Sequence, residues 1–355
     1  MSRVRLAVAG AGLIGRAHIE RVVADDVTEL SAIVDPGPTG SELADKYEVP
    51  LHDSLTELFE TDVPDGVILA TPNQLHVAGA LECIAAGVPV LVEKPLADSI
   101  EGGQRIVDAG QRAGVPVLTG HHRQHSPIMA KVKEIIRGGR LGTVVAIVGT
   151  AMFYKPDDYF DDNGGWRRKP GGGPMLLNLI HEVNQIESLL GDIVSVQATS
   201  SNATRGLPVE DTAAMIFQFE SGALGTFLLS DTAGSARSWE HTSQENKEYP
   251  TYGDEDSYHI AGTKGSLSIP TMRLKTYRGP SSWWEPFEVS TEVVDRSDPL
   301  VNQIAHFAAV IRGEATPVVS GETGLRSLRV VNAVREAART GQRVDVGSAD
   351  VGHRA

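Results

Sequence analysis

Gly10-Ala11-Gly12-Leu13-Ile14-Gly15 lies near the start of the chain, directly after the apolar run Val4–Ala9. A strand that leads into a glycine turn and then a helix is the context in which the pattern G-x-G-x-x-G indicates a dinucleotide-binding site. Gly10 permits the tight turn, Gly12 lets the backbone approach a pyrophosphate, and Gly15 lets the helix pack against the strand. The N–H groups at the start of the helix would then face the phosphates.

Asp35 supplies a second signal, because it follows Gly15 by twenty residues and ends the apolar run Leu30–Val34. A carboxylate at this point accepts hydrogen bonds from the adenine ribose hydroxyls of NAD. It would repel the 2′-phosphate of NADP by roughly 4 kcal/mol at about 4 Å and an effective dielectric constant near 20. No lysine or arginine lies between Asp35 and Lys46 to offset that repulsion. The sequence therefore favours NAD over NADP, although Asp35 alone would read as an ordinary turn residue.

The composition is that of a globular protein of two domains. The chain has 355 residues, 41% of them hydrophobic and 22% charged, and a formal charge of −14. Nucleic acids and anionic membranes need a basic face, so we expect neither as a partner. No run is long enough to span a membrane, and a single cysteine, Cys83, excludes an intrachain disulfide. These features predict a cytoplasmic location.

The first 120 residues alternate short apolar runs with helical stretches, a pattern typical of a doubly wound parallel sheet of the Rossmann type. Expected strands cover Val4–Ala9, Glu29–Val34, Gly66–Ala70, Val88–Val92 and Pro116–Thr119. Expected helices cover Leu13–Ala24, Ser41–Tyr47, Ser54–Glu60, Gln74–Ala86 and Ile100–Ala113. We therefore expect a nucleotide-binding domain over residues 1–121.

Beyond residue 121 the pattern changes to strands joined by short turns, which predicts an α/β domain over residues 122–355 with a largely antiparallel open sheet. Helices are expected at Ile128–Arg137, Met175–Leu190, Leu300–Arg312 and Glu322–Thr340, and strands at Thr143–Phe153, Val194–Ser201, Thr212–Phe219, Ala223–Ser230, Tyr258–Ala261 and Gly265–Ile269. A polar loop is expected from Tyr154 to Pro174, and Asp231–Ser257 is expected to be a mobile loop or a partner contact.

Ligands of doubly wound sheets bind at the carboxyl ends of the strands, so the residues that follow each strand are candidates for the site. Ala70-Thr71-Pro72-Asn73 follows the third expected strand and is succeeded by His76. Glu93-Lys94-Pro95 follows the fourth. A lysine in this place would point into the cofactor crevice, although Lys94 taken alone would read as a surface residue in a turn.

Together these motifs make the chain similar to the Gfo/Idh/MocA oxidoreductases, which include inositol dehydrogenases and glucose–fructose oxidoreductase. The resemblance rests on residues spread over about three quarters of the chain: Gly10–Gly15, Thr71-Pro72-Asn73 with His76, Glu93-Lys94-Pro95, Gly171-Gly172-Gly173 with His181, and Gly262-Thr263-Lys264-Gly265-Ser266-Leu267. It implies a cofactor site made of Gly10, Gly12, Leu13, Ile14, Gly15, Asp35, Thr71, Pro72, Asn73, His76, Glu93 and Lys94. It also implies a second domain whose open sheet forms homodimers or homotetramers.

The resemblance further implies that Lys94 and His181 face the substrate beside the nicotinamide. The family usually has an aspartate four residues before this histidine, but here that position is Leu177. Asn178 stands three residues before His181 and would share its face of a helix, without the negative charge. We therefore assign Lys94, His181 and Asn178 as catalytic residues in a distinct branch of the family.

Four further residues are candidates for substrate binding. Lys155 and Arg167 belong to a loop that interleaves charged and aromatic residues, which suits the hydroxyls and the apolar face of a sugar, although a solvated loop would look the same. His122 and Arg123 follow a strand end between the domains, and the resemblance also places them near the substrate. Because no carboxylate or cysteine accompanies the neighbouring histidines, we expect no metal site.

These assignments predict a dehydrogenase that acts on CH–OH groups and oxidises a secondary hydroxyl of a sugar, sugar acid or cyclitol. In this hypothesis His181 removes the hydroxyl proton, for which an imidazole with an ordinary pKa of about 6.5 is suited, while Lys94 holds the hydroxyl. Two alternatives stay open: a glycosidase that uses NAD for transient oxidation, and a sugar-sensing regulator without chemistry.

Overall fold

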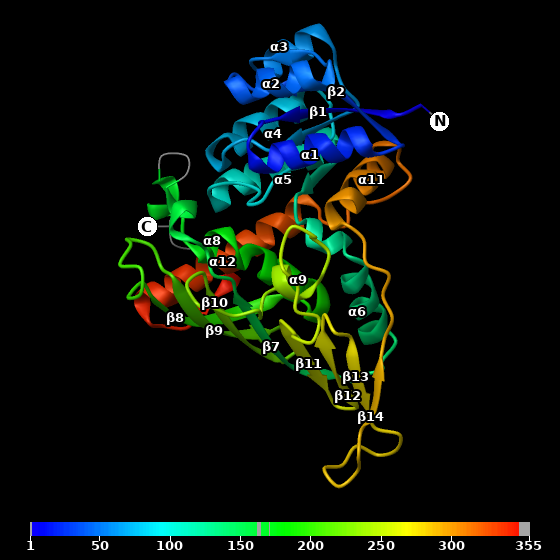
Figure 1. Ribbon diagram of the computed structural model, residues 1–355, viewed down its shortest axis with the longest axis vertical. Coiled ribbons are helices and arrows are strands. Elements are labelled where there is room, and N and C mark those ends of the chain that lie inside the picture. Colours follow the sequence, from blue (N-terminus) through cyan, green and yellow to red (C-terminus); the bar gives the residue numbers. More distant parts are fainter. Residues whose placement is uncertain (1, 162–164, 170, 348–355) are drawn as a thin grey trace. The chain divides into compact units, whose positions relative to one another are not determined.

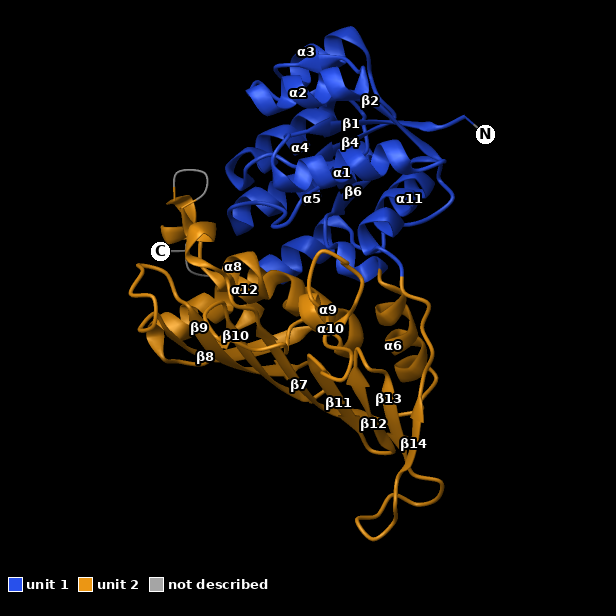
Figure 2. Ribbon diagram, viewed as in Figure 1, with its two compact units in different colours: residues 1–125, 297–328 blue, residues 126–296, 329–355 orange. Residues whose placement is uncertain are grey.

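The computed structural model describes residues 2–161, 165–169 and 171–347, and the chain forms two compact units (Figure 2). The first unit contains the residues up to 125 together with 297–328, and the second contains 126–296 together with the residues from 329 onward. The expected domain boundary at residue 121 stays a prediction. The return of residues 297–328 to the first unit is a feature that the sequence pattern does not reveal.

The first unit contains a six-stranded parallel sheet with the strand order β3-β2-β1-β4-β5-β6 (Figure 1). Its strands are β1 (Val4–Ala9), β2 (Thr28–Val34), β3 (Leu51–His52), β4 (Gly66–Leu69), β5 (Val90–Val92) and β6 (Val117–Thr119). The order reverses between β1 and β4, as in a Rossmann fold, and this reversal is where such sheets bind a dinucleotide. The predicted fold class of the N-terminal part is confirmed.

The helices that follow these strands are α1 (Leu13–Ala24), α2 (Pro38–Tyr47), α3 (Leu55–Thr61), α4 (His76–Ala85) and α5 (Ile100–Ala113), with the short 3₁₀ turns η1 (Asn73–Leu75) and η2 (His122–His125). The bounds of α1 and α5 are those predicted. Side-chain caps explain some of these starts: Ser54 accepts the Glu57 N–H at α3, and Ser99 accepts the Gly102 N–H at α5.

Helix α11 (Pro299–Ile311) joins the first unit although it comes from near the end of the chain. Its Ile304 and Phe307 are fully buried in a hydrophobic cluster with Leu6 of β1 and Ile33 of β2. Gly66 makes room for this packing, because a Cβ atom there would lie 3.0 Å from the Phe307 ring.

The second unit contains a nine-stranded sheet with the order β14-β13-β12-β11-β7-β10-β9-β8-β15. Its strands are β7 (Val144–Met152), β8 (Ile193–Ser201), β9 (Thr212–Phe219), β10 (Leu224–Ser230), β11 (Tyr258–Gly262), β12 (Gly265–Ile269), β13 (Arg273–Thr276), β14 (Glu288–Thr291) and β15 (Val344–Asp345). Only β7 and β10 pair in parallel, so the predicted largely antiparallel sheet is confirmed.

One face of this sheet carries the helices α6 (Pro127–Arg137), α8 (Pro174–Leu177) and α9 (Leu179–Leu190) (Figure 1). The helix predicted over Met175–Leu190 is therefore divided, and Asn178 lies at the break. The 3₁₀ turns η3 (Asp157–Phe160) and η4 (Trp166–Arg168) occupy the loop expected at 154–174, of which residues 162–164 and 170 lie outside the described residues. The long helix α12 (Gly321–Thr340) follows α11.

The segment Asp231–Ser257, expected to be a loop, is packed in part. It contains the short helix α10 (Trp239–Thr242), and Trp239 is only 4% exposed. The Trp239 indole N–H donates to Glu245 at 3.1 Å, and Glu245 also accepts the Ser126 hydroxyl at the start of α6. These contacts hold in place a segment whose sequence periodicity predicts neither a helix nor a strand.

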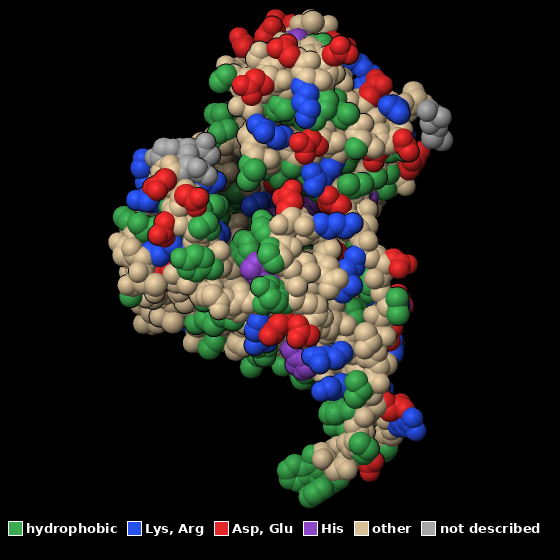
Figure 3. Space-filling model, in the orientation of Figure 1, with side chains coloured by type: hydrophobic (Ala, Val, Ile, Leu, Met, Phe, Trp, Pro, Cys, Tyr) green, Lys and Arg blue, Asp and Glu red, His purple; other side chains and the backbone are tan. Residues whose placement is uncertain are grey.

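The other face of the sheet exposes apolar side chains, among them Val148, Ile216 and Leu224. The connection between β13 and β14 contains Trp283 and Trp284, which are 87% and 81% exposed. Hydrophobic side chains gather at the tip of this connection (Figure 3). The homodimer or homotetramer implied by the family resemblance stays a prediction. No helix in the described part of the chain is long and apolar enough to cross a bilayer.

Replacing Phe307 tests whether α11 is part of the first unit's core. We expect Phe307→Ala to lower the free energy of unfolding by about 3–5 kcal/mol, because it leaves a cavity in a closed cluster. Val301→Ala on the exposed side of the same helix should change it by less than about 1 kcal/mol. Urea denaturation monitored by circular dichroism measures both. Equal effects of the two substitutions would contradict the packing described.

Candidate functional site

The glycine turn lies between β1 and α1, and neighbouring backbone atoms leave no space for a side chain at Gly10 or Gly15. Gly10 has φ +99°, and a Cβ atom there would lie 2.5 Å from the Ala70 carbonyl oxygen. A Cβ atom on Gly15 would lie 1.9 Å from the Gly10 carbonyl oxygen. Gly12 faces open space and precedes α1 without a side-chain cap, and Leu13 is 88% exposed. The first N–H groups of α1, including that of Ile14, are thus available to an anion.

Asp35 is bound to this turn through its carboxylate. Its Oδ2 accepts the Ala11 N–H at 2.6 Å, and its Oδ1 accepts the Gly37 N–H at 2.7 Å. Each carboxylate oxygen has a second lone pair, so Asp35 can still accept from a ligand hydroxyl. The sequence predicted that Asp35 follows the strand; that it also holds the glycine turn in place is a finding of the structure.

The loop after β4 brings Thr71, Pro72 and Asn73 to the same edge of the sheet as the glycine turn. The Thr71 hydroxyl oxygen is buried, and among the described residues it has no hydrogen-bond partner. His76 is fully buried, with Nδ1 2.8 Å from the Pro95 carbonyl oxygen and Nε2 2.9 Å from that of Thr71. Burial lowers the pKa of His76. Its position joins the loops after β4 and β5.

Glu93 is a buried acid that is hydrogen-bonded through both carboxylate oxygens. It is 4% exposed, and its Oε1 lies 2.8 Å from Nε2 of His18 on α1, while its Oε2 accepts the Lys94 N–H at 3.1 Å. Burial opposes its ionisation, but the hydrogen bond and charge of His18, with the charges of Lys94 and His122, outweigh it and lower the pKa to about 2. Sequence reasoning missed His18; its place three residues after Gly15 is the only available signal.

Lys94 is half-buried directly after this carboxylate and precedes Pro95 through a cis peptide bond. The histidines that follow β6 are held neutral at pH 7. Burial, and then the Lys94 charge, lower the pKa of His121 to about 3, and burial with the neighbouring Arg123 lowers that of His122 to about 4. Among the described residues, no group of three or more histidine, cysteine, aspartate or glutamate side chains is arranged to hold a metal ion.

In the second unit, Asn178 and His181 lie at the start of α9. Asn178 separates α8 from α9, and its carbonyl oxygen accepts the His181 N–H at 3.0 Å. His181 is 6% exposed. Glu182, next in sequence, is 1% exposed and accepts the Tyr258 hydroxyl, so it is engaged in the interior.

Lys155 follows β7 and contacts Asn178. Its Nζ donates to Asn178 Oδ1 at 2.6 Å and lies 4.6 Å from the centroid of the Tyr159 ring. Burial lowers the pKa of Lys155 to about 8, opposed by the charges of Asp231 and Glu240. Two residues that the sequence singled out for different reasons are therefore direct neighbours.

The glycine triplet packs the loop that holds Arg167. A Cβ atom on Gly172 would lie 2.4 Å from the Arg167 Cα atom, and one on Gly173 would lie 2.3 Å from the Glu210 carboxylate. Glu210 accepts the Met175 N–H at 2.9 Å at the start of α8. Arg167 donates to the Tyr159 carbonyl oxygen at 2.8 Å, with its guanidinium 4.1 Å from the centre of that ring.

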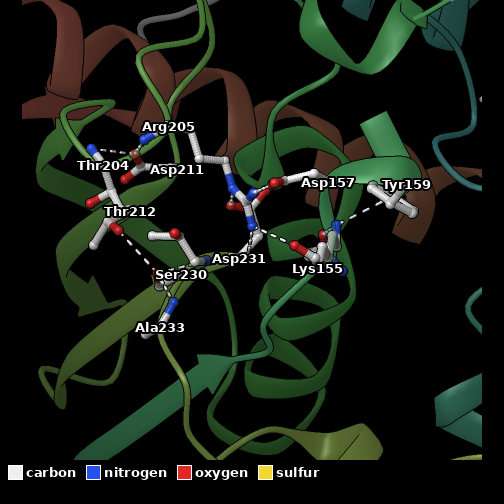
Figure 4. Close-up of polar contacts among 12 residues, drawn as sticks. Lys155, Asp157, Tyr159, Thr204, Arg205, Asp211, Thr212, Ser230, Asp231 and Ala233 are labelled. Atoms are coloured by element: carbon white, nitrogen blue, oxygen red, sulfur yellow. Dashed lines mark hydrogen bonds and ion pairs between the residues drawn. The ribbon is translucent and has the colours of Figure 1, made fainter. Parts of the chain in front are cut away.

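Arg205, which sequence reasoning missed, ties the Lys155 loop to the end of β10 (Figure 4). Its guanidinium pairs with Asp231 at 3.2 Å and Asp157 at 3.1 Å and donates to the carbonyl oxygens of Lys155 and Asp231 at 2.6 Å each. Asp211 fixes the Arg205 backbone by accepting the N–H groups of residues 204 and 205 at 3.0 Å. No local pattern around Arg205 signals this role, because its partners lie up to fifty residues away.

The predicted site residues thus form two groups, each within one unit. The cofactor candidates, with Lys94, His122 and Arg123, follow the strand ends of the first unit. In the second unit Lys155 contacts Asn178, Lys155 and Arg167 contact the same Tyr159 ring, and the His181 N–H donates to the Asn178 carbonyl oxygen. The first group has the chemistry of a dinucleotide site. The second is rich in hydrogen-bond donors.

Comparisons with known proteins agree with this division. Residues 4–121 match the sequence model described as "Oxidoreductase family, NAD-binding Rossmann fold", and residues 129–268 match that of the GFO/IDH/MocA C-terminal domain. The chain is 27% identical to 1,5-anhydro-D-fructose reductase of Ensifer adhaerens, over 82% of this chain and 83% of that protein. It is 23% identical to myo-inositol 2-dehydrogenase of Thermotoga maritima, over 94% of this chain and 96% of that protein.

Among solved structures, the WlbA dehydrogenase from Bordetella pertussis in complex with NADH and UDP-GlcNAcA superposes with a TM-score of 0.77. It is 25% identical, over 97% of this chain and 98% of that chain. The WlbA dehydrogenase from Chromobacterium violaceum, in complex with the same two compounds, has a TM-score of 0.79 at 25% identity, over 97% of this chain and 96% of that chain. Both units therefore have counterparts in one known architecture.

The Glu93–His18 pair can be tested through stability. We expect Glu93→Gln to lower the free energy of unfolding by about 3 kcal/mol at pH 7, because it removes a buried carboxylate whose pKa is lowered to about 2 in the folded state. The folded-state pKa of Glu93 is about 2 against an ordinary 4.5. The stability that it contributes is therefore complete above about pH 4.5 and is lost as the pH falls toward 2. The difference between the wild type and the variant should narrow by about 1 kcal/mol between pH 7 and pH 3.5.

Urea unfolding at the two pH values measures this difference. Glu29→Gln is the matched control, since Glu29 is exposed and 3.9 Å from Arg5; it should change stability by less than about 1 kcal/mol. A Glu93→Gln variant as stable as the control would refute the inference that the pair anchors the Lys94 turn.

Proposed function

The chain belongs to the GFO/IDH/MocA family of oxidoreductases, and on this basis we propose that it is an NAD-dependent dehydrogenase acting on a secondary hydroxyl of a sugar, sugar acid or cyclitol. The names of its relatives, an anhydrofructose reductase and inositol dehydrogenases, support a small polyol-like substrate. The observation that carries the proposal is that α1 begins after Gly12 without a side-chain cap and that the Asp35 carboxylate accepts the Ala11 N–H of the same turn.

The residues around the glycine turn fit a dinucleotide. Side chains are excluded at Gly10 and Gly15, α1 begins without a side-chain cap, and the buried Thr71 hydroxyl has a free hydrogen-bonding capacity. Backbone N–H groups at such a helix start bind phosphate oxygens. When bound, NAD supplies a nicotinamide ring that accepts a hydride.

Asp35 favours NAD over NADP in this proposal. Its two bonds to backbone N–H groups hold the carboxylate at the end of β2, where the ribose hydroxyls of the cofactor bind in this fold. A 2′-phosphate at that place would meet a negative charge. Lys46, the first lysine after Asp35 in the sequence, lies over the Tyr47 ring at 4.7 Å.

Lys94 is the residue that we assign to hold the substrate hydroxyl. The bond from its own N–H to Glu93, and the bond from Glu93 to His18, fix its backbone relative to α1. An ammonium group stabilises the negative charge that develops on an oxygen as its proton leaves. Glu93 with His18 thus acts as a positioning pair for Lys94.

His181 is the residue that we assign to accept the hydroxyl proton. Its backbone is set by the bond to the Asn178 carbonyl oxygen, and its side chain is largely shielded from solvent. General-base catalysis by a positioned histidine typically contributes about 10²–10⁴-fold to the rate. The missing aspartate at position 177 leaves Asn178 as the polar residue beside this base.

Cofactor preference provides one test. We expect wild-type protein to bind NAD more tightly than NADP, and Asp35→Ser to shift the ratio of the two dissociation constants toward NADP by at least about tenfold, because the repelling charge is gone. Titration calorimetry with each cofactor measures the ratio. Asp45→Ser, on the outer part of α2, removes the same charge and should leave the ratio unchanged. A wild type that prefers NADP would overturn the assignment of Asp35.

The proton acceptor provides a second test. His181→Ala should reduce turnover by about 10²–10⁴-fold with NAD affinity unchanged, because only the base is lost. NADH formation with a panel of inositols, aldoses, polyols and sugar acids gives the rate. His259→Ala, an exposed histidine on β11, is the matched control and should keep full activity. A loss below about tenfold would reject His181 as the base, and sugar release from glycosides without net NADH would contradict a net dehydrogenase.

A further inference from the structure

The amide of Asn178 has a fixed polarity. A lysine ammonium can only donate hydrogen bonds, so the group that Asn178 turns toward Lys155 at 2.6 Å must be its carbonyl oxygen. The Nδ2 group is then left to donate, and within the described part of the chain it has no hydrogen-bond partner. An aspartate at position 178 would only accept hydrogen bonds, whereas Asn178 also presents N–H groups.

Lys155 is a buried cation without an ion-pair partner. It is 6% exposed, and no carboxylate of the described residues lies within 4.0 Å of its Nζ. Asp231 is the acid whose charge most strongly raises the pKa of Lys155, but it pairs with Arg205 at 3.2 Å. Buried charges are ordinarily paired, because leaving water costs several kcal/mol per ion. The ammonium therefore lacks an anion.

The aromatic ring beside Lys155 does not supply one. Tyr159 lies 4.6 Å from the Lys155 Nζ, with its hydroxyl at 3.5 Å, and the Arg167 guanidinium lies 4.1 Å from the same ring. A ring attracts cations through its quadrupole but carries no net charge. Arg167 thus adds a second positive charge next to Lys155.

Two of the three acids near Lys155 are engaged by other groups. Glu182, Asp231 and Glu240 line, with Lys155 and Asn178, a hollow of about 10 Å³, which holds a single water at most. Glu182 accepts from Tyr258, and Asp231 pairs with Arg205. The charges of Asp231 and Glu240 oppose the effect of burial on the pKa of Lys155, which is about 8, so the side chain is mainly an ammonium at neutral pH.

We infer that Lys155 and Asn178 form a carboxylate-binding subsite, so that the substrate is a sugar acid or related hydroxy acid and not a neutral polyol. The inference rests on the proposed function. A carboxylate accepts several hydrogen bonds and has no proton to place, so it satisfies both side chains and neutralises Lys155. A neutral hydroxyl would leave the buried ammonium without a counter-charge, and hydrogen bonds to ionised groups are about twice as strong as neutral ones.

Matched substrate pairs test the inference: D-gluconate with D-glucitol, and D-glucuronate with D-glucose. We expect an acid to give a kcat/KM at least about tenfold above its neutral partner. Lys155→Met should lower the ratio of the acid's kcat/KM to that of its neutral partner by about 10–100-fold. Asn178→Asp, nearly isosteric, should abolish the preference as well, because it gives Lys155 an internal anion.

The control is Lys264→Met, which removes the same charge from an exposed turn and should keep the preference within about twofold. Calorimetric binding of D-gluconate and D-glucuronate to the wild-type protein–NAD complex separates this inference from the proposed function. Acid binding that depends on Lys155, without any NADH formation, would support the subsite and reject the dehydrogenase. Oxidation of neutral polyols without preference for acids would support the dehydrogenase and overturn the subsite, as would a complex that binds neither acid.

Discussion

The contact between Gly15 and the Gly10 carbonyl oxygen is the constraint on which the first unit depends. Because neither residue has a Cβ atom, α1 can begin where β1 ends and its first turn can lie against the ends of β1 and β4. The strand order reverses at this point, so loops from both halves of the sheet meet there. Asp35 then fixes the turn from the β2 side through the Ala11 N–H. The place where backbone N–H groups are free is thereby set by the lack of side chains.

A second constraint runs from α1 to β5. His18 lies on the buried side of the helix that the glycine turn starts, and it meets Glu93 at the end of β5. The start of α1 and the turn that carries Lys94 are therefore connected through Glu93. Glycine packing allows the helix to come close, so that His18 can hydrogen-bond to Glu93, which in turn accepts the Lys94 N–H.

The sequence was sufficient for the features that depend on neighbouring residues. The glycine turn, the bounds of α1 and α5 and the Rossmann and antiparallel sheets follow from local pattern. The break at Asn178 could not be predicted, because apolar residues on both sides continue a helical periodicity and Lys155 comes from another loop. Strand β13 has four residues and β14 has no buried residue, so the alternation that reveals a strand is short in one and absent in the other. The place of α11 depends on Phe307 meeting Gly66, which lies 241 positions earlier in the sequence.

Two residues of the second unit differ from what the family resemblance implies: Leu177 stands where an aspartate is expected, and Asn178 is the polar residue next to it. An aspartate at position 178 would be an anion within hydrogen-bond distance of Lys155, and the two charges would neutralise each other. With Leu177 and the amide of Asn178, neither position offers Lys155 a carboxylate, and Asp231 pairs with Arg205 instead. In the proposed subsite, the negative charge that pairs with Lys155 comes from the ligand. The residue types at 155, 177 and 178 are therefore expected to change together and not independently.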